Sequence, residues 1–206
     1  MKNSLPLQNA ADYTEKVGRF DQTHAVLGFR SFGYHDQRRF AAGVLSVVLG
    51  GGMSSRLFSE VREKRGLAYR TGATVRQYYE TGVFVVNVMT TNPKEAFDVI
   101  LSEIKRIKEI QIEDEELEGS KFRMKAYLKK LEDSTEIAGR NAGSVLNYGK
   151  VFTREEIYGY VDSVSKEDVL DAANHILNLS EVAVALTSPE TLEKDFRSSL
   201  RVFSKE

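Results

Sequence analysis

The sequence predicts an α+β domain in which helices pack on one face of a mainly antiparallel sheet. Two observations lead to this fold class. Apolar patterns follow the order strand, helix, hairpin, several helices and a last strand, so strands and helices are segregated along the chain. The two strands of the hairpin are joined by a short turn, which makes them antiparallel. A strictly alternating βαβα arrangement is the weaker alternative.

The first third of the chain contains a lead-in, a strand and two helices. Residues 1–20 have no sustained hydrophobic period and are interpreted as a linker or lead-in, which leaves a single domain over residues 21–206. Residues 24–30 form an apolar run typical of a buried strand. Residues 36–49 carry apolar side chains at helical spacing and predict a core helix, which three glycines then end. A short polar helix is predicted over residues 54–66.

The middle of the chain predicts a hairpin and two helices. Residues 68–79 and 82–90 are rich in Val, Tyr, Thr and Phe and form the hairpin. Asn92 and Pro93 start the next helix, with Asn as its cap and Pro at its first position. A further helix is predicted over residues 114–131.

The last third of the chain carries strong helix-start signals. Two capping boxes are formed by the pairs Thr153/Glu156 and Ser165/Asp168. A final strand over residues 182–186 and a short helix that begins at Ser188 complete the prediction.

Composition excludes several function classes. The 206 residues include 29 Lys and Arg against 30 Asp and Glu, and this balance argues against a general nucleic-acid binder. No stretch approaches the ~20 apolar residues of a transmembrane helix, and the first residues lack the apolar block of a signal peptide, so no membrane partner is expected. The sequence does not give the compartment, for which cytoplasm serves only as a default. The absence of cysteine excludes disulfides, iron–sulfur clusters and thiol catalysis.

The three histidines predict no metal site. None of His24, His35 and His175 belongs to an H-x-x-x-H pair. Asp171 and His175 are spaced to place two ligands on one helix face. Because no third ligand is in view, an ion pair or a helix-end histidine is the favoured interpretation. His24 and His35 are interpreted as capping or packing residues.

The three consecutive glycines Gly50, Gly51 and Gly52 match neither the P-loop nor the dinucleotide-binding pattern, because a helix precedes them and no lysine follows in place. A helix C-cap followed by a flexible connector explains at least one of them. Three in a row further suggest a hinge or loop on the substrate side, or backbone that must approach another group closely.

The charged run over residues 60–65 has the composition of a solvated surface, but its position between the glycines and the hairpin favours a functional role. A tight turn at Gly66 would point Arg62 and Tyr69 toward the same space. Arginine supplies up to five hydrogen-bond donors and tyrosine one. Such a pair suits the binding of a carbonyl or a developing oxyanion.

Residues 49–69 read LGGGMSSRLFSEVREKRGLAY. This stretch resembles the signature of the C-terminal half of the pitrilysin/insulysin-type zinc metallopeptidases, the inverted-motif family that includes mitochondrial processing peptidase and its bacterial relatives. The similarity extends over about residues 24–186, with helices and strands in a compatible order.

The resemblance implies two homologous α+β halves that close around a peptide-sized chamber. The N-terminal half carries H-x-x-E-H and a downstream Glu, which bind zinc and supply the general base. The C-terminal half lacks zinc and contributes an arginine and a tyrosine to the substrate beside the metal. Those positions fall on Arg62 and Tyr69, with Gly50 to Gly52 just before them.

The sequence departs from the full enzyme because H-x-x-E-H does not occur in it. The chain alone is therefore expected to be inactive, with no metal or other cofactor of its own and zinc in the missing N-terminal half. That half, on the same polypeptide or a separate subunit, and a peptide substrate are the expected partners. A self-dimer of the isolated domain is a further expectation.

Two function classes follow. The first is the substrate-binding, zinc-lacking half of a zinc endopeptidase that cleaves short or unstructured peptides. The alternative is a structural or binding homologue that keeps the fold without proteolysis, as in some family members within respiratory complexes. The presence of both Arg62 and Tyr69 favours the first. An unrelated α+β ligand-binding domain is the third and least favoured interpretation.

Overall fold

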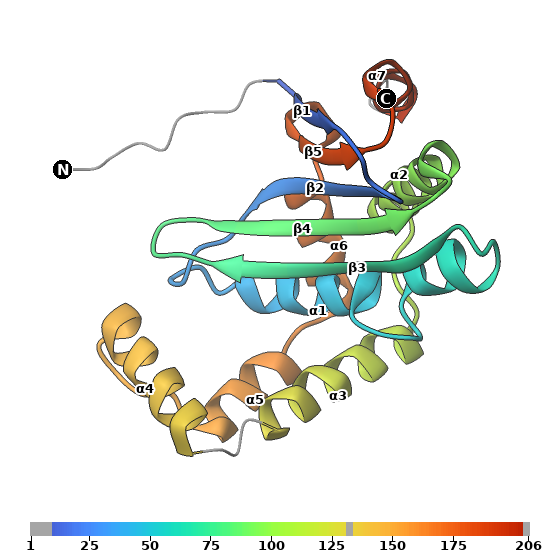
Figure 1. Cartoon of the computed structure of the whole chain (residues 1–206). Coiled ribbons are helices and arrows are strands. Elements are labelled where there is room, and N and C mark those ends of the chain that lie inside the picture. The colour runs from blue at the N-terminus through green and yellow to red at the C-terminus, as the bar shows by residue number, and fades with distance from the viewer. Residues whose placement is uncertain (1–9, 131–133, 204–206) are drawn as a thin grey trace.

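The computed structural model describes residues 10–130 and 134–203. Its centre is a five-stranded sheet of order β1-β5-β2-β4-β3 (Figure 1). β1 runs parallel to β5, and the other neighbouring strands are antiparallel. The strands are β1 (Asp12–Val17), β2 (Thr23–Ser31), β3 (Ala68–Gln77), β4 (Gly82–Thr90) and β5 (Ala183–Ser188).

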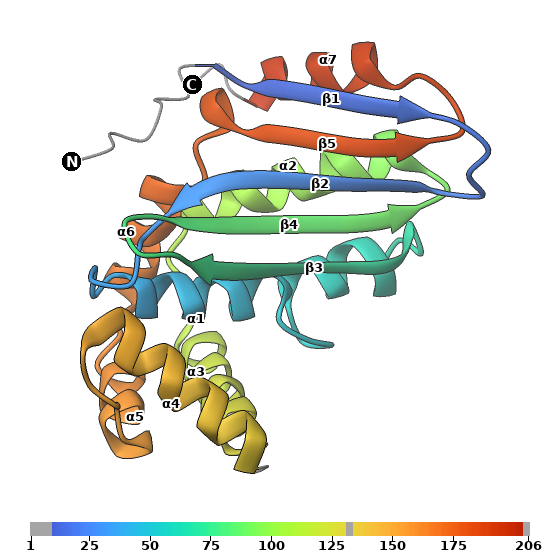
Figure 2. The ribbon, with the colours of Figure 1, turned by 60° about the vertical axis from the view of Figure 1, so that its left-hand side comes forward.

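The helices gather on one side of this sheet, with α1, α2 and α6 behind the strands in Figure 2. A second group of helices, α3, α4 and α5, extends away from the sheet below α1 (Figures 1 and 2). The helices and helical turns are α1 (Arg39–Gly50), η1 (Phe58–Glu63), α2 (Pro93–Glu109), α3 (Asp114–Lys130), α4 (Ser134–Tyr148), α5 (Arg154–Asp162), α6 (Lys166–Ile176), η2 (Leu179–Glu181) and α7 (Glu193–Phe203). Among the helices described, none combines the length and apolar composition that crossing a bilayer requires.

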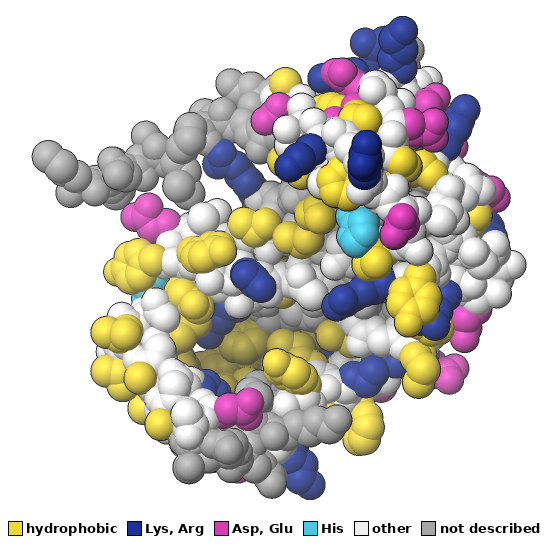
Figure 3. Space-filling view, viewed as in Figure 1, with side chains coloured by type: hydrophobic (Ala, Val, Ile, Leu, Met, Phe, Trp, Pro, Cys, Tyr) yellow, Lys and Arg dark blue, Asp and Glu magenta, His cyan; other side chains and the backbone are white. Residues whose placement is uncertain are grey.

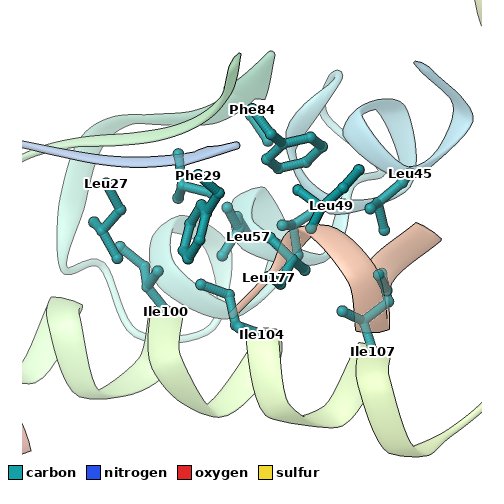
Figure 4. Close-up of a cluster of buried hydrophobic side chains, with 14 of the residues drawn as sticks. Leu27, Phe29, Leu45, Leu49, Leu57, Phe84, Ile100, Ile104, Ile107 and Leu177 are labelled. Carbon is teal, nitrogen blue, oxygen red and sulfur yellow. The ribbon is translucent and has the colours of Figure 1, made fainter. Parts of the chain in front are cut away.

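Alternating burial along the strands shows why the helices cover one face. In β4, Phe84, Val86 and Val88 are buried, whereas the residues between them are partly exposed. The buried side chains meet those of α1 and α2 in one apolar core, in which Figure 4 labels members from β2, β4, α1, α2 and the segments nearby. The α+β fold with a mainly antiparallel sheet and helices on one face is therefore confirmed.

The N-terminal segment differs from the sequence-based interpretation. Asp12–Val17 forms the edge strand β1, so residues 12–17 are not a lead-in. The Asp12 amide donates to the Val182 carbonyl at 2.9 Å, and the Gly18 amide donates to the Ser188 carbonyl at 3.0 Å. The partner strand lies at the other end of the chain, and a polar edge strand has no apolar period of its own. Residues 1–9 lie outside the described part of the chain.

Three smaller differences concern helices. The polar helix expected over residues 54–66 is the shorter π-helical segment η1. The last helix begins at Glu193, because Ser188 still belongs to β5. The helix α4 had no counterpart in the prediction. The helix expected over residues 114–131 is described to Lys130, and position 131 lies outside the described residues.

The capping signals at α5 and α6 are confirmed. The Glu156 amide donates to the Thr153 hydroxyl at 3.1 Å, and the reciprocal bond is 2.8 Å long. The same pair of bonds joins Ser165 and Asp168 at 3.0 and 2.8 Å. Asn92 precedes α2 as expected, but its side chain donates to Glu95 instead of accepting a helix N–H.

Direct backbone packing joins the end of α1 to β3. A Cβ atom on Gly50 would lie 2.0 Å from the backbone nitrogen of Ala73 and 2.4 Å from the carbonyl carbon of Gly72. No side chain fits between the two backbones, because real Cβ atoms do not approach other atoms so closely. Gly50 therefore sets the distance between α1 and the edge strand that carries Tyr69.

A nearly buried ion pair fixes the segment that follows the glycines. The Arg56 guanidinium binds both carboxylate oxygens of Glu116 in α3, at 2.7 and 2.8 Å. Hydrogen bonds from Arg56 hold the pKa of the Glu116 carboxyl below its usual value. Because bidentate pairs of this kind fix orientation as well as distance, the start of η1 is tied to α3.

Replacing Gly50 with alanine should lower the free energy of unfolding by about 1–3 kcal/mol, because the new methyl group must displace backbone of β3. Gly119→Ala in α3 is the matched control, since nothing lies within 4 Å of the methyl group it adds. That control should gain about 0.5–1 kcal/mol from helix propensity. Urea denaturation measures both, and equal stability of Gly50→Ala and the parent would contradict the packing argument.

Glu116→Gln should lower the free energy of unfolding at pH 7 by about 1–2 kcal/mol, the low end for a charged partner because the Glu116 side chain is 32% exposed. The lowered pKa means that this contribution is present above the ordinary carboxyl pKa and is lost as pH falls through the folded value. The difference from the parent should therefore shrink in denaturation curves recorded near pH 3.

The neighbouring Glu115→Gln is the control for this prediction, because Glu115 is exposed in the same helical turn. It should leave stability at pH 7 within about 0.5 kcal/mol of the parent. Equal stability of the two variants at pH 7 would show that the Arg56–Glu116 pair does not hold this segment.

Candidate functional site

The candidate site lies where η1 turns into β3. The turn is closed by a bond from the Gly66 amide to the Arg62 carbonyl at 3.0 Å and one from the Leu67 amide to the Val61 carbonyl at 2.8 Å. Gly66 has φ +62°, a conformation that favours glycine. Val61 and Leu67 are buried on either side of this turn, so the apolar core fixes its position.

The turn brings Arg62 and Tyr69 together, as the sequence predicts. The Arg62 guanidinium carbon lies 5.6 Å from the centre of the Tyr69 ring and 4.9 Å from that of Phe58. Both distances fall in the range of cation–π attraction. The arginine is thus held between two aromatic rings, which orients its hydrogen-bond donors without consuming them.

Tyr69 sits at an irregularity of the sheet. The β3–β4 register shifts between Ala68 and Arg70, which leaves Tyr69 at a bulge. Bulges redirect a side chain out of the normal alternation. Tyr69 is 73% exposed and Arg70 after it is exposed as well, so these two successive residues do not alternate. The Tyr69 phenol and the exposed Arg62 guanidinium therefore face solvent from neighbouring positions.

The other two cations of the charged run around Arg62 are already in ion pairs. The Glu60 carboxylate binds Lys64 and Arg65, each at 2.5 Å. Hydrogen bonds from Lys64 and then Arg65 hold the pKa of Glu60 below its usual value. Within residues 10–130 and 134–203, no carboxylate pairs with Arg62. Its positive charge is consequently left for a ligand.

The three glycines have distinct places. Gly50 packs against β3, so the backbone that it approaches belongs to this chain. The Gly51 amide caps α1 by donating to the Val47 carbonyl at 3.0 Å. Gly52 is exposed in the connector toward Arg56. A role of this connector as a loop or hinge on the substrate side stays a prediction.

The histidines take part in aromatic contacts. His175 stacks on Phe32, with ring centres 5.0 Å apart, and His35 contacts Tyr79 edge-on at the same distance. His24 lies in β2 opposite Met89 of β4. In the part of the chain that the structure describes, no three His, Cys, Asp or Glu side chains come together as a metal site, and Asp171 with His175 has no third partner.

Sequence reasoning missed two residues that build the site. Phe58 supplies the second ring around Arg62, and its position four residues earlier in the helical segment was the available signal. Arg56 anchors the segment to α3, but its partner is 60 residues away and no local pattern indicates it. Together, Phe58 and Arg56 hold the charged run in place, so that residues 56–69 form a platform for the Arg62 guanidinium.

This platform can bind an electron-rich oxygen. Arg62 and Tyr69 present N–H and O–H donors side by side, while aromatic contacts and the buried turn hold them in place. Prearranged donors of this kind stabilise negative charge that develops on a carbonyl oxygen. The arrangement is therefore suited to binding and charge stabilisation.

Comparison with known proteins gives a consistent family. A family model described as the peptidase M16 inactive domain matches residues 4–124. The uncharacterized zinc protease YmxG of Bacillus subtilis is 33% identical over 189 residues, which cover 89% of this chain and 46% of that protein. An uncharacterized zinc protease of Rickettsia bellii is 32% identical, with 84% of this chain and 42% of that protein covered.

Solved structures agree on the fold. A protease from Helicobacter pylori superposes with a TM-score of 0.78 at 22% identity, covering 89% of this chain and 46% of that one. A peptidase M16 inactive domain from Pseudomonas fluorescens gives a TM-score of 0.70 at 23% identity, covering 89% of this chain and 44% of that one.

The chain spans less than half the length of these two zinc protease relatives. The matching family model nevertheless covers more than half of the chain, and relatives above 30% identity cover most of it. The resemblance noted in residues 49–69 is thereby confirmed, and the chain belongs to the M16 peptidase family, in which it represents the inactive domain.

Proposed function

We propose that this chain is the substrate-binding, zinc-lacking half of a zinc endopeptidase that cleaves short or unstructured peptides. The observation that carries the proposal is the exposed pair of Arg62 and Tyr69, which a buried turn holds together with no carboxylate to neutralise the arginine within the described residues. Membership of a family whose relatives are described as zinc proteases adds support.

In this role the two side chains act on the substrate's carbonyl oxygen. The Arg62 guanidinium donates N–H groups and carries a fixed positive charge, and the Tyr69 phenol donates one O–H. Both donors gain strength as the carbonyl oxygen becomes more negative during peptide hydrolysis. They would therefore stabilise the transition state more than the bound peptide, which raises the rate of the chemical step.

The surrounding sheet supports binding of an extended peptide. β3, which carries Tyr69, is one of the two edge strands. An edge strand can accept a further strand through main-chain hydrogen bonds, a mode that depends little on side-chain identity. An extended peptide at this edge would pass close to Tyr69.

The metal expected for this activity does not fit this chain. Its described residues contain no cluster of His, Cys, Asp or Glu able to hold a metal ion. We therefore place zinc and the general base in a separate N-terminal half, on the same polypeptide or another subunit. Exposed Phe122, Tyr127 and Leu146 on α3 and α4 support contact with that half, or self-association when it is absent.

Arg62→Ala and Tyr69→Phe, each tested in the complete peptidase with its zinc-bearing half, should lower kcat/KM for a quenched unstructured peptide by ~10²–10³-fold, the usual cost of losing one oxyanion donor. The thermal midpoint should stay close to that of the parent, because both side chains are exposed. Undiminished turnover by both variants would remove the role assigned here.

Arg65→Ala is the matched control for Arg62→Ala. It removes an arginine from the same charged run, but one that is already paired with Glu60. Its activity should remain near that of the parent. If Arg65→Ala and Arg62→Ala lose activity equally, the loss reflects the net charge of this surface and not a donor at one position.

A second prediction concerns the isolated chain. After incubation with zinc and gel filtration, it should hold no stoichiometric metal by atomic spectroscopy and should not cleave the same peptide. Tightly bound zinc with activity would overturn the proposal and would direct attention to Asp171 and His175. If the complete protein also proves inactive while it binds zinc, the alternative of a non-proteolytic structural or binding homologue is favoured.

A further inference from the structure

A second site lies away from Arg62, where the start of α1 faces α4 and α5. A cavity of about 340 Å³ opens there, within the range typical of small-ligand pockets. Figure 3 shows this side of the molecule hollowed between the sheet and α4, with hydrophobic side chains at the base of the hollow. The lining residues are Tyr34, Arg39, Phe40, Arg140, Asn141, Gly143, Ser144, Asn147, Tyr148, Phe152 and Ile157.

Four of the lining residues are aromatic. Tyr148 contacts Tyr34 edge-on with ring centres 5.4 Å apart, and contacts Phe152 in the same way at 5.0 Å. Burial raises the pKa of the Tyr148 phenol above its usual value. Phe40 and Ile157 complete an apolar surface suited to an aromatic or branched aliphatic group.

Two arginines enter this apolar pocket, and no Asp or Glu belongs to its described lining. The Arg39 Nη1 already has an acceptor, since it donates to the Tyr34 carbonyl, and the guanidinium carbon lies 4.4 Å from the centre of the Phe40 ring. Arg140 is different. Its Nη1 atom is buried, and no hydrogen-bond acceptor reaches it from the described residues. Arg56 and Arg123 also hold a buried nitrogen without an acceptor, but Arg140 lines a cavity whose described lining contains no Asp or Glu. Leaving such a donor unpaired is costly, so an acceptor from outside would be favourable.

We propose that this pocket binds the free carboxylate at the C-terminus of a peptide whose last residue is aromatic or branched aliphatic. A carboxylate matches the planar guanidinium of Arg140 and neutralises its positive charge in the apolar pocket. The terminal side chain then packs against Tyr148 and Phe152. The site is distinct from the Arg62/Tyr69 pair and involves no bond cleavage.

The polar residues of the lining favour a peptide over a small acid. Asn141 and Asn147 bring amide groups to the same wall. Asn147 donates through its amide nitrogen to the Gly143 carbonyl at 2.8 Å, which leaves its carbonyl oxygen to accept a peptide N–H. Ser144 likewise donates to the Lys150 carbonyl at 2.8 Å and keeps its oxygen as an acceptor. Acceptors beside a carboxylate site match the last amide groups of a peptide chain.

The test is fluorescence anisotropy with a labelled hexapeptide that ends in Phe, as the free acid and as the C-terminal amide. The chain should bind the acid roughly 10–100-fold more tightly than the amide, the usual effect of one charged hydrogen bond. In Arg140→Gln the two forms should bind equally, because the group that distinguishes them is gone. Equal binding of acid and amide by the parent chain would overturn the proposal.

Two controls establish whether Arg140 itself recognises the carboxylate. Arg154→Gln removes an arginine from the neighbouring helix α5 that does not line the cavity, and it should keep the preference for the acid. A thermal melt of Arg140→Gln shows whether the variant is folded. Should it be unfolded, Asn147→Ala and a hexapeptide ending in Gly serve instead, and each should weaken binding of the acid severalfold.

Two further measurements show whether the bound carboxylate belongs to a peptide or a small acid, and whether the pocket acts independently of the Arg62 site. If 3-phenylpropanoate displaces the labelled acid as well as the unlabelled hexapeptide does, the pocket binds a small apolar acid and the peptide assignment is wrong. Arg62→Ala should keep the preference for the acid over the amide, because that preference is assigned to Arg140. Failure of the pocket proposal is therefore distinguishable from failure of the proposed endopeptidase role, which is measured by turnover.

Discussion

The contact on which the rest of the site depends is the packing of the end of α1 against the backbone of β3. Because Gly50 has no side chain, the end of α1 packs directly on the edge strand β3. The segment between them must therefore leave α1 and return to the start of β3 over a short distance. The buried turn at Gly66 completes that return. Arg62 and Tyr69 meet for this reason, since one lies before the turn and the other after it.

Charge pairing then decides which cation is available. Lys64 and Arg65 share the Glu60 carboxylate and Arg56 binds Glu116, so these three cations near Arg62 already have an ion-pair partner. The pairs of Glu60 with Lys64 and Arg65 lie at the surface, where single ion pairs contribute little to stability, whereas the Arg56–Glu116 pair is more buried. Because of these pairs, Arg62 is the cation of the charged run that stays available to a ligand, and it lies beside the Tyr69 phenol.

Local signals in the sequence predicted most of the fold, and non-local contacts account for what it missed. The hairpin and the capping boxes at Thr153 and Ser165 depend on residues a few positions apart, and both are confirmed. The turn at Gly66 is equally local, so the meeting of Arg62 with Tyr69 could be anticipated. The strand Asp12–Val17 could not, because its pairing partner lies at the other end of the chain. The aromatic pocket is likewise assembled from three separate segments.

Arg62 and Arg140 differ in how well their hydrogen-bond donors are satisfied in the free protein. Arg62 is exposed, so water molecules accept hydrogen bonds from its donors until a carbonyl oxygen displaces them. Its donors therefore carry no free-energy cost in the free protein. Arg140 holds a buried nitrogen in an apolar pocket without an acceptor among the described residues, where water cannot compensate as cheaply. A ligand carboxylate would remove that penalty, and part of its binding free energy would come from relieving a cost already present in the free protein. Like any ligand that binds only the folded state, a peptide in the Arg140 pocket should also stabilise the fold.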